Sequence, residues 1–262
     1  MDLIILVFLL GGLFLGWSLG ANDAANVFGT AVGTHMISFQ TAAIVCGIFV
    51  ILGAVISGAG TTATLGKLGS INAMPGAFAV CVAAGLAVYL MTKSGLPVST
   101  TQAIVGAIVG WNIYTGSSTN IQILITIILT WVLCPIIAGL IAMFFFILTK
   151  KILQISSLHL LRLDAYTRAA LLLAGAFGAY SLGANNIANV MGVFVPISPF
   201  TEINFMNILT LSSTGQLFLI GGIAIAVGVI TYSKRVMLTV GNDLLKLSPV
   251  AAFIVVFSHS IV

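Results

Sequence analysis

The sequence predicts an all-α polytopic membrane protein made of two inverted repeats, with broken helices and a re-entrant helical hairpin. The prediction rests on composition, on long apolar runs and on an internal repeat. Of the 262 residues, 60% are hydrophobic and only 5% are charged, and the mean hydropathy is +1.23. Soluble domains carry about 25% charged residues. A soluble core could not bury this much apolar surface, so we expect a multi-pass protein of the cell membrane.

Six long apolar runs predict the membrane-spanning helices, each of which takes about 20 apolar residues. No basic residue precedes the first run and no cleavage site follows it, so we interpret that run as a retained span rather than a signal peptide. The net charge is +4, and the basic residues that produce it lie mostly at the ends of the runs. This distribution indicates no nucleic-acid partner. The runs are 3–19, 41–59, 77–91, 121–148, 169–182 and 217–232.

An internal repeat divides the chain into two related halves. The segment SLGANDAANVFGTAVG at 18–33 returns as SLGANNIANVMGVFVP at 181–196, with ten of sixteen positions identical. We therefore expect a first transmembrane repeat at 1–148 and a second at 169–262. The charged linker 149–168 joins them, and its Lys and Arg residues predict a cytoplasmic location.

The glycines of the repeated segment predict breaks in two membrane helices. Gly20 and Gly183 stand where each polar cluster begins, and glycine weakens a helix. Irregular backbone at membrane depth is tolerated where it lines a cavity. Transporters built from inverted repeats place such breaks at their substrate and ion sites.

The polar residues of the repeat predict a cation site. An acid inside the membrane is costly, which makes Asp23 a candidate functional residue. Asn and Asp offer oxygen ligands to a hard cation such as sodium. A packing role is the alternative, because Asn22 and Asn26 lie four residues apart, as do Asn185 and Asn189, and such pairs can join neighbouring helices.

A second motif, GLPVSTTQAIVGAIVG at 95–110, predicts an anion site. Pro97 can begin a helix, and Ser99, Thr100 and Thr101 are suited to cap it, with Gln102 following. The apolar run that follows is too short to cross a membrane, which favours a re-entrant half-helix. Helix N-termini bind oxyanions such as phosphate and sulfate. An ordinary kinked span, with the hydroxyls bonded back to the helix, is the alternative.

The spans contain no basic residue that could neutralise such an anion. Lys67 and Lys93, the nearest candidates in the first half, look like residues of loops or span ends. Bound cations could supply the missing charge, and Asp23 could help to hold them. This predicts coupled movement of an anion and a cation. His259 lies in an apolar run and is expected to be packed, with a pore-lining role as the alternative.

GANDAAN together with PVSTTQAIVGAIVG resembles the inorganic phosphate transporter family of sodium- or proton-coupled symporters. The resemblance implies two inverted repeats, each with a GAND-like motif and a PVSTT-like hairpin, and it implies a homodimer. It also implies site residues. Phosphate would contact Ser99, Thr100, Thr101, Gln102, Asn22 and Asn185. Sodium would contact Asn22, Asp23, Asn185 and Asn186, with Asn26 and Asn189 as weaker candidates.

The chain departs from the family pattern in two places. Asn186 replaces the acid expected in the second copy, so the two halves differ electrostatically. No PVSTT-like segment follows the second GAN motif. Matching Ala77-Phe78 to Ala252-Phe253 places that segment about 10–15 residues beyond Val262. We therefore expect the sequence to be part of a longer protein.

The motifs together predict a secondary active transporter that imports phosphate with sodium by alternating access. Sodium is a co-transported ion, and no other cofactor is expected. A proton-coupled phosphate or sulfate permease is the first alternative, and an anion channel is the second. An enzyme is not expected, because Asp23 has no partner acid or histidine nearby in the sequence.

Overall fold

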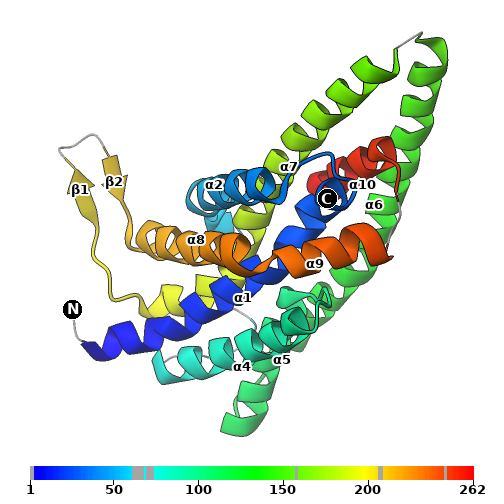
Figure 1. Ribbon diagram of the computed structural model, residues 1–262. Coiled ribbons are helices and arrows are strands. Elements are labelled where there is room, and N and C mark those ends of the chain that lie inside the picture. The colour runs from blue at the N-terminus through cyan, green and yellow to red at the C-terminus, as the bar shows by residue number, and fades with distance from the viewer. Residues whose placement is uncertain (1–2, 61–67, 69–73, 157–158, 206–208, 245–246) are drawn as a thin grey trace.

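The computed structural model describes residues 3–60, 68, 74–156, 159–205, 209–244 and 247–262 (Figure 1). Five helices of this described part, α1, α2, α4, α6 and α8, are long and apolar enough to cross a membrane. The helices are α1 (Leu3–Gly33), α2 (Phe39–Ser57), α4 (Met74–Lys93), α5 (Thr100–Thr115), α6 (Ile121–Ile155), α7 (Leu160–Met191), α8 (Ser213–Tyr232), α9 (Lys234–Leu238) and α10 (Pro249–Ile261).

The predicted helical membrane architecture is confirmed. All six apolar runs fall within α1, α2, α4, α6, α7 and α8, apart from the last two residues of the second run, which follow α2. A short antiparallel pair, β1 (Ile203–Phe205) and β2 (Leu209–Leu211), follows a 3-10 turn at Gly192–Ile197. This pair projects from one side of the helices (Figure 1).

Helix breaks at Gly20 and Gly183 are not found, so that prediction is wrong. α1 and α7 run without interruption through both glycines. In lipid, an interrupted helix would leave backbone groups without hydrogen-bond partners. The chain bends elsewhere: α9 and the π-helical turn Thr239–Leu244 meet α10 at 119°.

The glycine of the first polar motif serves a close helix crossing instead. A Cβ atom on Gly20 would overlap the carbonyl oxygen of Ile225 in α8. Reciprocally, a Cβ atom on Gly228 of α8 would overlap the carbonyl oxygen of Trp17 in α1. The backbones of α1 and α8 therefore touch directly, which small residues allow in membrane helices.

The second motif makes the equivalent crossing. A Cβ atom on Gly183 of α7 would overlap the carbonyl oxygen of Val50 in α2, and one on Gly53 would overlap that of Tyr180. Each half thus contributes one helix to each crossing. Helices of the first repeat, 1–148, therefore pack directly against helices of the second repeat, 169–262.

The equivalent helices α1 and α7 run in opposite directions. Gly12, near the start of α1, lies against Met191 at the end of α7. Phe28, near the end of α1, lies against Gly175 in the middle of α7. This antiparallel arrangement is what an inverted repeat requires. The linker 149–168 consists of the end of α6, the start of α7 and their capping residues Ser156 and His159; residues 157–158 lie outside the described part.

Replacing Gly20 by alanine tests the close crossing. We expect Gly20→Ala to destabilise the protein by about 1–3 kcal/mol, because the new methyl group must push α8 away. Thermal unfolding in detergent, followed by size-exclusion chromatography, measures the effect. Gly106→Ala in α5 is the control, because a Cβ atom there meets nothing within 4 Å. Equal melting of the two variants would contradict the crossing.

Candidate functional site

A cavity of about 700 Å³ lies between the two polar motifs. Its walls come from α1, from the turn between α4 and α5, and from α5, α6, α7 and α10. The polar lining residues are Asp23, Asn26, Ser99, Thr100, Thr101, Ser181, Asn185, Asn186, His259 and Ser260. The other lining residues are Val27, Pro97, Val98, Trp131, Cys134, Pro135, Ala138, Gly178, Leu182 and Val262.

The N-terminus of α5 opens onto this cavity. Ser99 caps the helix, and its Oγ accepts a hydrogen bond from the Gln102 backbone N–H at 3.3 Å. The N–H groups of Thr100 and Thr101 belong to the first turn and have no acceptor within the helix. Both residues line the cavity. The first turn therefore offers hydroxyl and backbone donors to an anion, with the helix dipole in the favourable direction.

Asn22 holds the turn that precedes α5. Its Nδ2 donates to Thr92 Oγ1 at 2.8 Å and to the Leu96 carbonyl oxygen at 3.0 Å. Its Oδ1 accepts a hydrogen bond from the Val98 backbone N–H at 2.9 Å. Asn22 is fully buried and does not line the cavity. Its geometry is therefore that of a residue that positions the hairpin.

Asp23 connects α1 to the start of α5. Thr100 Oγ1 donates to Asp23 Oδ1 at 3.2 Å. Asp23 is only 6% exposed, and it lines the cavity. Its Oδ2 has no hydrogen-bond partner among the residues that the structure describes. An accessible carboxylate oxygen without a protein partner is suited to bind a cation.

Thr101, which follows Thr100 in α5, is hydrogen-bonded to the other half of the chain. Asn189 Nδ2 donates to Thr101 Oγ1 at 2.9 Å and to Asn186 Oδ1 at 2.8 Å. Asn186 Nδ2 in turn donates to the Leu182 carbonyl oxygen at 3.1 Å. Consecutive threonines thus touch the two copies of the repeated motif, one in α1 and one in α7.

Most residues predicted for the site lie together at the cavity, and three do not line it. Asn22, Gln102 and Asn189 stand outside the lining, and the side chain of Gln102 is exposed. Asn185 and Asn26 are exposed towards the cavity, and neither amide has a hydrogen-bond partner in the described part of the chain.

Other lining residues were not predicted from the sequence. Trp131 and Pro135 of α6 form part of the wall, and Ser181 belongs to the repeat but was not singled out. His259 was expected to be packed, yet it is exposed and lines the cavity. The polar residues of the run 121–148, Gln122, Thr126 and Thr130, do not line the cavity, so the sequence offered little signal for this wall.

The cavity lining contains no lysine or arginine. Within the described residues, no group of three or more His, Cys, Asp or Glu side chains could hold a metal ion. An anion in the cavity would therefore meet hydroxyl, amide and backbone donors, the imidazole of His259 and one carboxylate. This donor set includes no lysine or arginine charge that could neutralise an anion.

Arg235, a basic residue outside the cavity, bonds to the end of α4 just before the hairpin turn. Arg235 Nη1 in α9 donates to the Lys93 carbonyl oxygen, the last of α4, at 2.7 Å. Gly95 has a φ of +78°, and a Cβ atom there would lie 3.1 Å from Arg235 Nε. The guanidinium offsets the negative end of the α4 dipole close to the anion donors of α5.

Comparison with known proteins gives consistent matches. The sequence profile of the "Phosphate transporter family" matches residues 19–262. A relative from Pyrococcus furiosus, named "Putative phosphate permease", is 28% identical over all of this chain and 81% of its own length. A relative of the same description from Haemophilus influenzae is 25% identical over 94% of this chain and 79% of its own length.

A solved structure has the same fold. It is described as "The sodium-dependent phosphate transporter", and it superposes with a TM-score of 0.82 at 24% identity. The match covers 99% of this chain and 84% of that one. Given the profile match over 19–262 and the apolar helices, this chain belongs to the phosphate transporter family and is a multi-pass membrane transporter rather than an enzyme.

Proposed function

We propose that this protein imports inorganic phosphate together with sodium, by alternating access to the 700 Å³ cavity. One observation carries the proposal: the start of α5 is bonded to both polar motifs at the edge of a cavity whose lining has no lysine or arginine. The structurally similar protein is described as sodium-dependent, which supports the choice of cation. We place the protein in the cell membrane with the linker 149–168 on the cytoplasmic side, and the homodimer stays a prediction.

Phosphate is proposed to bind at the first turn of α5. The hydroxyl groups of Ser99 and Thr101 supply donors, together with the free N–H groups of that turn. Thr100 contributes its backbone N–H, because its hydroxyl already donates to Asp23. Asn185 on the facing helix α7 adds an amide that has no other partner in the described residues. Asn22 and Gln102 are given supporting roles, because neither side chain lines the cavity.

Sodium is proposed to bind beside the phosphate at Asp23, with amide oxygens of Asn26 and Asn186 close by in the same lining. The electrostatics require such a cation. A doubly charged phosphate about 5 Å from a carboxylate would be repelled by about 7 kcal/mol at an effective dielectric constant of 20. That penalty would cancel the binding free energy of a roughly 10 µM ligand. A bound cation removes the penalty.

Alternating access follows from the position of α5 between the halves. Thr100 contacts α1 and Thr101 contacts α7, so any relative movement of these helices changes the phosphate site. The antiparallel arrangement of α1 and α7 gives the two repeats opposite orientations in the membrane, which is the geometry of transporters built from inverted repeats.

Proton coupling is the competing function, because Asp23 and His259 both line the cavity and both titrate. Phosphate uptake into proteoliposomes separates the two. With sodium replaced by choline, the proposed function predicts loss of concentrative uptake, even under an inward proton gradient. Undiminished uptake in choline would establish proton coupling, and failure to concentrate phosphate under either gradient would indicate a channel.

Asp23→Asn tests the proposed cation site. We expect the sodium concentration for half-maximal uptake to rise about tenfold or more, because the neutral amide loses a charged oxygen ligand. The control is Asp243→Asn, which removes an exposed carboxylate that does not line the cavity. A sodium response in Asp23→Asn equal to that of the control would refute the assignment.

Thr101→Val tests the proposed phosphate site while preserving side-chain shape. A hydrogen bond to a charged group contributes about 1.5–3 kcal/mol, so we expect the KM for phosphate to rise about 10- to 150-fold. The half-saturating sodium concentration should change much less. Thr115→Val, at the far end of α5, is the control. Unchanged phosphate kinetics in Thr101→Val would count against this site.

Cys134 provides a direct probe of occupancy. It is exposed and lines the cavity, whereas Cys46 and Cys81 are buried. We expect a charged thiol reagent to modify Cys134, and phosphate with sodium to slow the reaction several-fold by filling the cavity. Mass spectrometry of the labelled protein measures this, with Cys134→Ser as the blank. Equal labelling rates with and without both ions would place the bound phosphate elsewhere.

A further inference from the structure

A second cavity, of about 570 Å³, lies where the turn between α1 and α2 meets the first turns of α7. α1 ends at Gly33 and α2 begins at Phe39, and both helices are candidate membrane spans. The turn between two such helices lies at the membrane surface, at the level of lipid headgroups. The lining combines apolar and polar side chains: Ile37, Leu172, Ser38, Thr41, Asp164 and Arg168.

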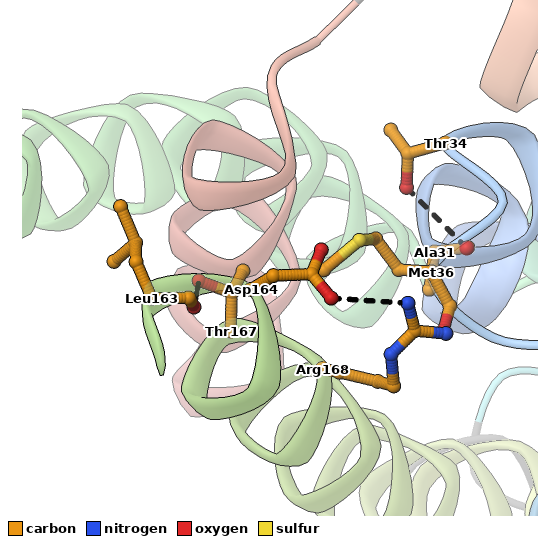
Figure 2. A network of polar contacts seen from close by, with 7 residues as sticks. All are labelled: Ala31, Thr34, Met36, Leu163, Asp164, Thr167 and Arg168. Atoms are coloured by element: carbon orange, nitrogen blue, oxygen red, sulfur yellow. Dashed lines mark hydrogen bonds and ion pairs between the residues drawn. The ribbon is translucent and has the colours of Figure 1, made fainter. Parts of the chain in front are cut away.

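The polar side of this cavity is an oppositely charged pair (Figure 2). Arg168 Nη2 lies 3.2 Å from Asp164 Oδ2, one helical turn away on α7. Arg168 Nη1 donates to the Met36 carbonyl oxygen in the α1–α2 turn at 2.6 Å. Figure 2 shows the guanidinium between the carboxylate and that turn. Each of the two charged side chains is 52% exposed.

Both charged groups keep unused hydrogen-bonding capacity. A guanidinium has five N–H donors, and Arg168 uses two of them within the described residues. Asp164 Oδ1 has no partner in the same part of the chain. Exposed ion pairs four residues apart on a helix contribute little to stability, so a ligand can share or replace this one. The cavity can therefore accept an anionic and a cationic group side by side.

From this arrangement we propose that the cavity binds the headgroup of a zwitterionic phospholipid that carries a primary ammonium, as in phosphatidylethanolamine. The phosphate of the lipid lies against the free edge of Arg168, which suits bidentate oxyanions. The ammonium donates to Asp164. Ile37 and Leu172 contact the glycerol and the first methylene groups of the lipid.

The charge balance selects this lipid class. The Arg168 and Asp164 charges sum to zero, so an anionic headgroup would leave Asp164 facing a negative ligand. A choline headgroup has the same charges, but its trimethylammonium has no N–H to donate to the carboxylate. The proposal is independent of the transported ions, because none of these residues lines the 700 Å³ cavity.

Native mass spectrometry of the full chain with chain-matched phosphatidylethanolamine, phosphatidylcholine and phosphatidylglycerol tests the proposal. We expect the ethanolamine lipid to be retained about tenfold more strongly than the other two, the effect of one charge-assisted hydrogen bond. Asp164→Asn should abolish the preference for ethanolamine over choline. Arg162→Gln, on the same helix but outside the lining, should keep it.

A second variant, Ala169→Phe, separates loss of lipid binding from a folding defect. It fills the cavity and leaves the ion pair in place. Arg168→Gln is less suitable, because it also removes the hydrogen bond to the Met36 carbonyl. We expect Ala169→Phe to release the lipid without changing the melting temperature by more than a few degrees. Soluble glycerophosphoethanolamine and inorganic phosphate should not compete at millimolar concentration. Competition by either one, equal retention of the three lipids, or full retention in Ala169→Phe would overturn the proposal.

Discussion

The fold depends on direct contact between helix backbones at two glycine crossings. α1 meets α8 at Gly20 and Gly228, and α2 meets α7 at Gly53 and Gly183. Because any side chain at these positions would separate the helices, the crossings fix the distance between the two halves. The polar residues that follow Gly20 and Gly183 are thereby brought to opposite sides of a single cavity. Continuous helices also keep their backbone hydrogen bonds satisfied at membrane depth.

The polar residues of the interior also make specific contacts that hold the elements together. Three polar residues near the hairpin have separate roles, because Asn22 holds the turn, Thr100 bonds α1, and Thr101 bonds α7. The cavity lining contains the carboxylate of Asp23, while the groups proposed to bind the anion are neutral dipoles. A site of this kind holds an anion strongly only when cations accompany it, so in the proposed mechanism tight binding and co-transport have the same physical origin.

Two arginines, Arg168 at the end of the linker and Arg235 in the second half, bond to backbone carbonyls of the first half. Arg235 bonds the last carbonyl of α4, and Arg168 bonds the Met36 carbonyl just beyond α1. Both carbonyls lie at the negative ends of helix dipoles, where a cation is stabilising. These contacts tie the two halves at their turns, away from the glycine crossings. The Arg168 contact also borders the second cavity, so a lipid bound there would act on the same turn.

Sequence alone determined the spans, the repeat and the identity of the central polar residues. Apolar runs and repeated motifs are local patterns, and an acid such as Asp23 or a capped short helix such as the one at Thr100 stands out in an apolar chain. Tertiary structure decided the rest, because it depends on segments far apart in the chain. Gly20 was expected to break a helix, and only the passage of α8 shows that it permits a contact. Likewise, only the fold shows that the side chain of Asn22 makes its hydrogen bonds to the hairpin turn and that His259 lines the cavity.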